Sequence, residues 1–193
     1  MIKTALDYIV LFHSTKNKAT TPCGLQAVKV DYHFHSLDLN VEVYIVDEPT
    51  LDWLGIYDSE TKCIIVNVRL IYNKHYNMEY VVFHEYFHSI QHLALLDETE
   101  GEYYEENCTT EEEIVYDSLL EQDCISIHSY AMEEACEMGA ELFCALLGFE
   151  INIEIREDLK MSQILSFFYK HVIEEVPRYK ELYNNLKSCK QSA

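Results

Sequence analysis

Residues 84 to 88 read His-Glu-Tyr-Phe-His inside an apolar run that predicts a buried helix. Because an α-helix turns about 100° per residue, His84 and His88 project from one face about 6 Å apart, where two imidazoles can share one zinc ion. Glu85 lies one step round the helix, beside such a metal instead of on it. A carboxylate there can take a proton from an attacking water and pass it to a leaving amine. The HExxH spacing therefore predicts peptide-bond hydrolysis, with Glu85 as general base.

A catalytic zinc site also needs a third protein ligand and an open fourth position. We expect this ligand from residues 129–148, whose apolar stripe predicts one helix that Ser129 caps and Gly148 ends. Beside the stripe lies a second face of polar side chains, which are Tyr130, Glu134, Glu137 and Glu141. Carboxylates rarely lie next to a core without a partner, and a metal ion would be one. Periodicity alone leaves the three glutamates as alternative ligands.

The order of these residues resembles that of a known family. A tyrosine, a glutamate seven residues later, and an Ala-Glu pair ending four residues after that glutamate are similar to the third-ligand helix of gluzincin metallopeptidases of the anthrax lethal factor and Pro-Pro endopeptidase type. The likeness covers about residues 53–149, and its matching positions are Tyr130, Glu137, Ala140 and Glu141. The resemblance implies that Glu137 binds zinc, that Tyr130 donates to the oxyanion and that Glu141 orients a ligand histidine.

Three other side chains near these segments could be ligands. His92 follows His88 by four residues, but relatives that use a third histidine place it six residues after the second, where this chain has Ala94. His128 precedes the glutamate helix and is a weaker alternative. Cys144 falls close to the acidic face, yet a free cysteine on a helix is usually a small buried hydrophobic residue. We expect a single zinc ion whose ligands are His84, His88 and Glu137.

Charge and cysteine content restrict the possible partners. The chain has 14 Lys and Arg against 34 Asp and Glu, a formal net charge of −20, which repels nucleic acid and anionic membranes and favours a cationic protein or peptide substrate. Much of the acidity falls in residues 97–113, a solvated segment between the two ligand helices. Seven cysteines without a CxxC pair indicate a reducing compartment. Without a secretory signal or a run of transmembrane length, we expect an intracellular protein.

The pattern of segments predicts an α+β, zincin-like fold in a single domain over residues 1–193, with a sheet-bearing part to about residue 96 and a helical part from about 97. Strands of a small twisted mixed sheet are expected at 26–34, 39–46, 53–57 and 63–68. Helices are expected at 3–12, from an Asn77 cap to about 95, and at 111–122, 129–147, 157–175 and 178–188. In zincins a substrate adds to a sheet edge over the cleft, and we expect residues 63–68 to form that edge.

The sequence is interpreted as a zinc endopeptidase. An alternative within enzymes is an intracellular regulatory protease that cuts a repressor-like or crosslinked protein. An alternative of another class is a zinc-binding interaction protein without turnover. The presence of Glu85 argues against a zinc-binding protein without turnover, because a purely structural site does not need a base at this position.

Overall fold

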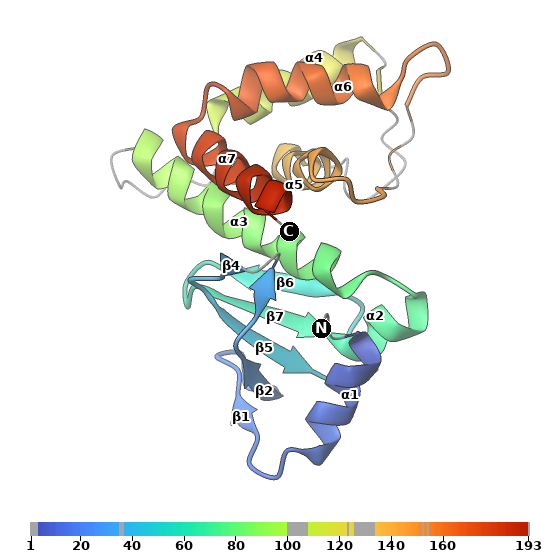
Figure 1. Ribbon diagram of the computed structural model, residues 1–193, viewed down its shortest axis with the longest axis vertical. Coiled ribbons are helices and arrows are strands. Elements are labelled where there is room, and N and C mark those ends of the chain that lie inside the picture. Colours follow the sequence, from blue (N-terminus) through green and yellow to red (C-terminus); the bar gives the residue numbers. More distant parts are fainter. Residues whose placement is uncertain are drawn as a thin grey trace. The chain divides into compact units, whose positions relative to one another are not determined.

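The computed structural model describes residues 4–34, 37–99, 108–122, 124–125, 134–151, 153 and 155–192 (Figure 1). Their fold is α+β, as predicted: an N-terminal mixed five-strand sheet, a long helix packed on it, and a helical C-terminal half. The chain divides into two compact units, Met1–Ser89 and Ile90–Ala193, and the boundary falls inside the long helix. The expectation of a single domain stays a prediction.

The sheet of the first unit has the strand order β1-β2-β5-β7-β6. The strand bounds are Ala19–Thr20 (β1), Gln26–Val30 (β2), Glu42–Val46 (β5), Gly55–Asp58 (β6) and Cys63–Asn67 (β7). In this sheet β5 and β7 are parallel, and the other neighbouring pairs are antiparallel. A separate two-strand ribbon pairs β3 (His33–Phe34) with β4 (Leu37–Asp38). The strand expected at 26–34 is therefore two strands, which belong to different sheets.

Strand β7 lies inside the sheet and is buried along its whole length, with Cys63 through Asn67 at most 1% exposed. An inner strand that is covered on both faces needs a continuous apolar run, which explains its Cys-Ile-Ile-Val sequence. On one face Cys63 and Ile65 pack with Ala27 and Val46. The prediction that residues 63–68 form a sheet edge is wrong, because β7 pairs with β5 on one side and β6 on the other. The outer strand at this end is β6.

Two helices of the first unit, α1 (Ala5–Ser14) and α2 (Val68–Lys74), pack against each other and against β5. A capping box formed by Thr4 and Asp7 starts α1. Helix α2 follows β7 without a loop and is not among the predicted helices. Its first residues, Val-Arg-Leu-Ile, extend the apolar run of the strand, so no change of period marks where the helix begins.

Asp47, just after β5, joins these two helices. Its carboxylate, 3% exposed, accepts hydrogen bonds from Nε and Nη2 of Arg69 in α2 at 2.7 and 2.8 Å, and it lies 2.7 Å from Nε2 of His13 in α1. Burial raises the pKa of Asp47, but the hydrogen bonds and charges of Arg69 and His13 outweigh burial and leave this pKa below its ordinary value.

The long helix α3 (Met78–Glu98) carries the HExxH segment. Asn77 caps it as predicted, since its side-chain oxygen accepts a hydrogen bond from the backbone N–H of Glu79 at 2.8 Å. The apolar residues around the motif are buried, and Val82, Phe83 and Phe87 have no exposed surface. The histidines thus belong to a helix whose apolar residues form part of the core.

The second unit consists of helices. They are α4 (Thr110–Glu121), α5 (Ala135–Leu146), α6 (Met161–Phe168), the π-helical turn η2 (Tyr169–Ile173) and α7 (Pro177–Ser192). Helices α4 and α7 agree with the prediction, apart from their ends. The expected helix 157–175 begins later, at Met161, and its last part is η2. Phe143, Phe168, Tyr179 and Leu186 are fully buried between these helices.

Helix α5 is shorter than the predicted 129–147. Glu134, directly before it, has an extended backbone (φ −135°, ψ 145°), so the helix does not pass through this residue. The alanine, methionine and glutamates of this segment favour helix, but propensity is a weak determinant where tertiary contacts decide. Ser129 and Tyr130 lie outside the described residues. The expectation that Tyr130 shares one continuous helix with Glu137 is wrong.

A buried carboxylate holds the second unit together. Glu112 of α4 has no exposed surface, and it accepts hydrogen bonds from Nε2 of Gln91 (2.7 Å), from the hydroxyl of Tyr179 (2.6 Å) and from the N–H and hydroxyl of Thr109 (3.1 and 3.2 Å). We call these four residues the Glu112 cluster. Burial raises the pKa of Glu112, and the hydrogen bonds offset part of that rise. The cluster joins the second half of α3 to α4 and α7.

The structure describes most of the cysteines and the helices that could be tested as membrane spans. Among the described cysteines, Cys23 is exposed and five are buried free thiols: Cys63, Cys108, Cys124, Cys136 and Cys144. Within the residues that the structure describes, no helix combines the length and the apolar character needed to cross a membrane.

The Asp47 contacts predict an acid-sensitive contribution to stability. Because the pKa of Asp47 is lowered in the folded protein, its stabilisation is present above the unfolded value of 3.8 and is lost as pH falls through the folded value. Asp47→Asn should lower the free energy of unfolding by about 1–3 kcal/mol at pH 7 and by progressively less as the pH falls below 3.8. Urea unfolding at pH 7 and at a series of pH values below 3.8 measures the difference. The exposed Asp52, changed to Asn, is the control and should leave stability unaltered.

Candidate metal centre

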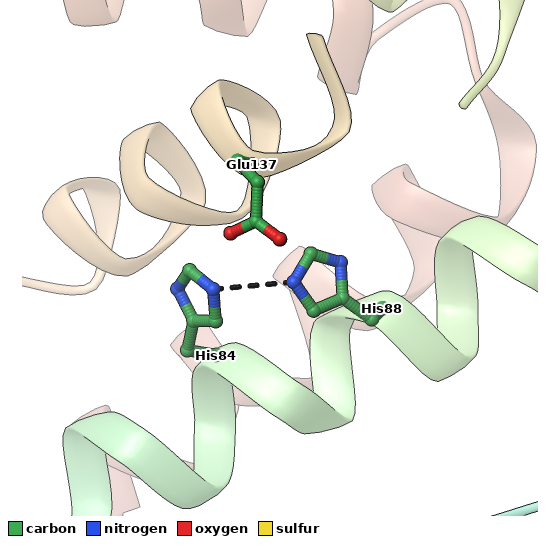
Figure 2. A group of neighbouring side chains, drawn as sticks. All are labelled: His84, His88 and Glu137. Atoms are coloured by element: carbon green, nitrogen blue, oxygen red, sulfur yellow. Dashed lines mark hydrogen bonds between the residues drawn. The ribbon is translucent and has the colours of Figure 1, made fainter. Parts of the chain in front are cut away.

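His84 and His88 lie one turn apart on α3, as the helix period predicts. Their Nε2 atoms are 3.1 Å apart, and their ring planes are inclined at 81° (Figure 2). Two nitrogens that each lie about 2.05 Å from a tetrahedral zinc ion are about 3.3 Å from each other. The two imidazoles are thus already spaced as ligands of one ion.

Glu137, in the first turn of α5, completes a group that could hold a metal ion. One ligand atom from each of His84, His88 and Glu137 lies within 4.8 Å of the other two. Figure 2 shows both imidazoles and the carboxylate pointing toward one another. Ligand atoms of one tetrahedral zinc ion lie about 3–4 Å from one another. The histidine pair has this spacing, and the three ligand atoms together lie within 4.8 Å of one another. Two imidazoles and a carboxylate match the His₂Glu donor set of catalytic zinc.

Partial exposure of the ligand side chains would give water or a substrate access to this group. His88 and Glu137 are half-buried, not sealed in the interior. Three protein ligands leave the fourth position of a tetrahedral ion for water or substrate, as in catalytic zinc sites, whereas structural sites use four protein ligands. Among the described residues, the group is therefore a possible metal site with partly exposed ligand side chains.

Glu85 is buried, only 8% exposed, and is not a member of the metal-ligating group. Its side chain passes close to the start of β6, where a Cβ added to Gly55 would lie 2.8 Å from Cγ and 3.0 Å from Oε1 of Glu85. Real Cβ atoms essentially never approach so closely. Position 55 therefore has to be glycine for α3 and β6 to hold Glu85 in this conformation. The residue predicted as general base thus follows His84 in the chain and is sterically confined.

The other candidates from the sequence have different environments. Glu134 and Glu141 share the acidic sequence pattern but do not belong to the group with the histidines. Glu134 accepts a hydrogen bond from the thiol of Cys136 at 3.5 Å, and Glu141 is 7% exposed. Cys144 is fully buried, as expected of a small hydrophobic residue. His92 is outside the group as well, and Tyr130 and His128 lie outside the described residues.

An aromatic row that sequence reasoning missed leads along α3 to the histidines. The rings of Tyr76 and Tyr80 are stacked, with centroids 6.4 Å apart and planes at 14°, and the ring of Tyr80 lies 6.0 Å from that of His84. The signal was present as tyrosines four and eight residues before His84. Tyr80 therefore restricts the space in which the imidazole of His84 can move.

Comparison with known proteins gives no family to which the chain can be assigned. A scan against protein-family models found no match, and neither a search of curated proteins nor one of solved structures found a significant match. The α+β fold and a possible His-His-Glu metal site are what the structure itself shows.

The metal site predicts stoichiometric binding that depends on both histidines. The protein should bind one Zn²⁺ ion, and saturating zinc should raise Tm, because a ligand that binds only the folded state stabilises it. His88→Ala should abolish both effects. His92→Ala, one turn further along the same helix, is the matched control and should bind zinc normally. Calorimetric titration and thermal unfolding measure the outcome, and undiminished binding by His88→Ala would disprove the site.

The close approach at Gly55 predicts a local steric effect. A methyl group there meets Glu85 and also lies 3.1 Å from Cγ1 of Val81, so Gly55→Ala must displace the glutamate or the strand. We expect a loss of about 1–3 kcal/mol in the free energy of unfolding, as for other overpacked sites. Zinc binding should remain, because the three atoms nearest to the added methyl group belong to Glu85 and Val81 and not to the histidines. Urea unfolding and zinc titration of the variant test this.

Proposed function

We propose that this protein is a zinc-dependent endopeptidase of gluzincin type, which hydrolyses peptide bonds. The observation that carries the proposal is the grouping of His84, His88 and Glu137, with the confined carboxylate of Glu85 adjacent to the first ligand. HExxH sequences occur by chance, but a chance occurrence does not bring a glutamate from another helix to the two histidines. The resemblance of the Glu137 segment to gluzincins supports the same conclusion.

Each side chain has a defined part in the proposed reaction. His84 and His88 would hold the metal through Nε2 of their imidazoles, which would require the proton of each ring to be on Nδ1. Glu137 contributes one negative charge and so offsets part of the charge of a divalent ion. Zinc bound by these residues would polarise the scissile carbonyl and make an attacking water more acidic. Glu85 would accept the proton of that water and then donate it to the amine that leaves.

Tyr130 remains a candidate donor to the oxyanion, on the strength of the family resemblance alone. Because Glu134 is extended, Tyr130 does not share a continuous helix with Glu137, and the expected common helix face gives this role no support.

The substrate that fits best is an extended, positively charged segment of a protein. Strand β6 is the outer strand of the sheet, and among the described residues no strand pairs with its other side. It starts at Gly55, next to Glu85, so a peptide that added to this edge would pass the proposed general base. The formal charge of −20 favours cationic segments and disfavours nucleic acid and anionic membranes as partners. We place the activity inside the cell, in keeping with the free cysteines.

Glu85→Gln separates peptide hydrolysis from simple zinc binding. The substitution keeps the shape of the side chain and all three metal ligands but removes the base. Zinc binding should survive, while cleavage of a peptide library, followed by mass spectrometry, should fall by at least about 100-fold. The control is Glu98→Gln, which changes an exposed glutamate of the same helix and should leave cleavage unaltered.

Two results would contradict the proposal in different ways. Full activity of Glu85→Gln would show that the mechanism is wrong. A wild-type protein that binds zinc but cleaves none of the library, including lysine- and arginine-rich members, would favour the zinc-binding interaction protein instead.

A further inference from the structure

Gln91 is buried one helical turn after His88, and its side-chain amide donates two hydrogen bonds. Its Nε2 donates one hydrogen bond to Oε1 of Glu112 at 2.7 Å and another to the backbone carbonyl of Cys136 at 2.8 Å. A glutamine amide nitrogen has two hydrogens, and both are thus used by these acceptors. A carboxylate and a carbonyl can only accept, so the orientation of the amide is fixed by its partners.

The carbonyl of Cys136 belongs to the peptide bond that joins Cys136 to Glu137. The hydrogen bond from Gln91 therefore holds the peptide plane from which the Glu137 backbone continues. On the continuous helix α3, Gln91 follows His88 by about 4.5 Å along the axis and lies about 60° round it. One amide thus connects the α3 turn after a ligand histidine to the backbone at the ligand glutamate.

Glu112 fixes this amide in turn. Because its carboxylate is fully buried and also accepts from Tyr179 and from Thr109, it has little freedom to move. Helix α5 approaches the pair so closely that a Cβ at Gly139 would lie 2.2 Å from Oε1 of Glu112 and 3.0 Å from Nε2 of Gln91. Because Gly139 has no side chain, α5 can approach Gln91 and Glu112 this closely.

We propose that Gln91, held by Glu112, is a positioning residue that sets the distance of Glu137 from the two histidines and thereby the affinity for metal. This inference rests on the proposed metal site and adds residues that neither the HExxH motif nor the family resemblance indicates. Gln91 acts on the position of a ligand and not on a reacting atom. It acts through the backbone of α5, as the outer hydrogen-bond partners of other metal sites act through their ligands.

The test compares zinc affinity with fold stability. Gln91→Met has a side chain of similar length without the amide, so it should keep the core filled and release the Cys136 carbonyl. Its dissociation constant for Zn²⁺, measured by competition with a chelating dye at 25 °C, should rise by about 10- to 100-fold. Circular dichroism verifies that the variant is folded. The measurement does not depend on peptidase activity.

Two controls exclude a general loss of stability as the cause. Val115→Ala, in the same helix as Glu112, makes a cavity in the core and should lower Tm without weakening zinc binding. Arg178→Gln removes the ion pair with Asp97, another tie between α7 and α3, and should also leave zinc affinity unchanged. If Gln91→Met does not fold, Gly139→Ala displaces the same pair from the α5 side and should weaken zinc binding.

The possible results are distinguishable. Wild-type affinity in a folded Gln91→Met protein, or in Gly139→Ala where the first variant does not fold, would overturn the positioning role and leave the metal site intact. Equal weakening by Val115→Ala would also overturn it, since any core defect would then suffice. Failure of the wild-type protein to bind zinc would instead remove the metal site, and the positioning role with it.

Discussion

A carboxylate that water cannot reach has to find its hydrogen bonds inside the protein, and Glu112 imposes this requirement on the helical unit. It is met by Gln91, Thr109 and Tyr179, which come from α3, the start of α4 and α7. Oε1 of Glu112 accepts from Gln91, whereas Oε2 accepts from both Thr109 and Tyr179. Removing Gln91 would therefore take a hydrogen bond from a buried acceptor, which costs more than the bond contributes. Gly139 is part of the same constraint, because any larger residue in α5 would occupy the position of the carboxylate. Polar contacts, together with apolar packing, therefore specify how these helices are arranged.

The fold could be predicted where two signals in the sequence agree. Helix α3 has an Asn77 cap, an apolar run and the histidine spacing, and it was predicted almost to its ends. Helix α2 has only a continuation of the apolar run of β7, so it was missed. The same run identifies β7 as a strand but gives no information about its neighbours, and an inner strand was taken for an edge. The predicted helix that contains α5 was too long. Glutamate favours helix, but Glu134 has an extended backbone in the structure.

The site residues also differ in how well the sequence predicts them, because some depend on contacts within one helix and others on contacts between distant segments. The pairing of His84 with His88 follows from helix geometry alone, because both partners are on one helix. Glu137 could be selected from three glutamates only through a resemblance, since all three share one face of the expected helix. The roles of Gln91 and Gly55 could not be predicted from the sequence. Gln91 contacts groups 21 and 45 residues away, and Gly55 matters only because Glu85 lies against it. No local pattern distinguishes these two residues from others of their type.

The distribution of cysteines gives each compact unit its own chemical reporter. Cys63 is buried in β7 of the first unit, whereas Cys108, Cys124, Cys136 and Cys144 are buried in the second. An alkylating reagent would reach Cys23 in the native protein and the buried thiols only as their surroundings open. The order in which the thiols are modified in rising denaturant would reveal whether the sheet and the helices unfold together. The protein thus carries intrinsic labels for the cooperativity of its own unfolding.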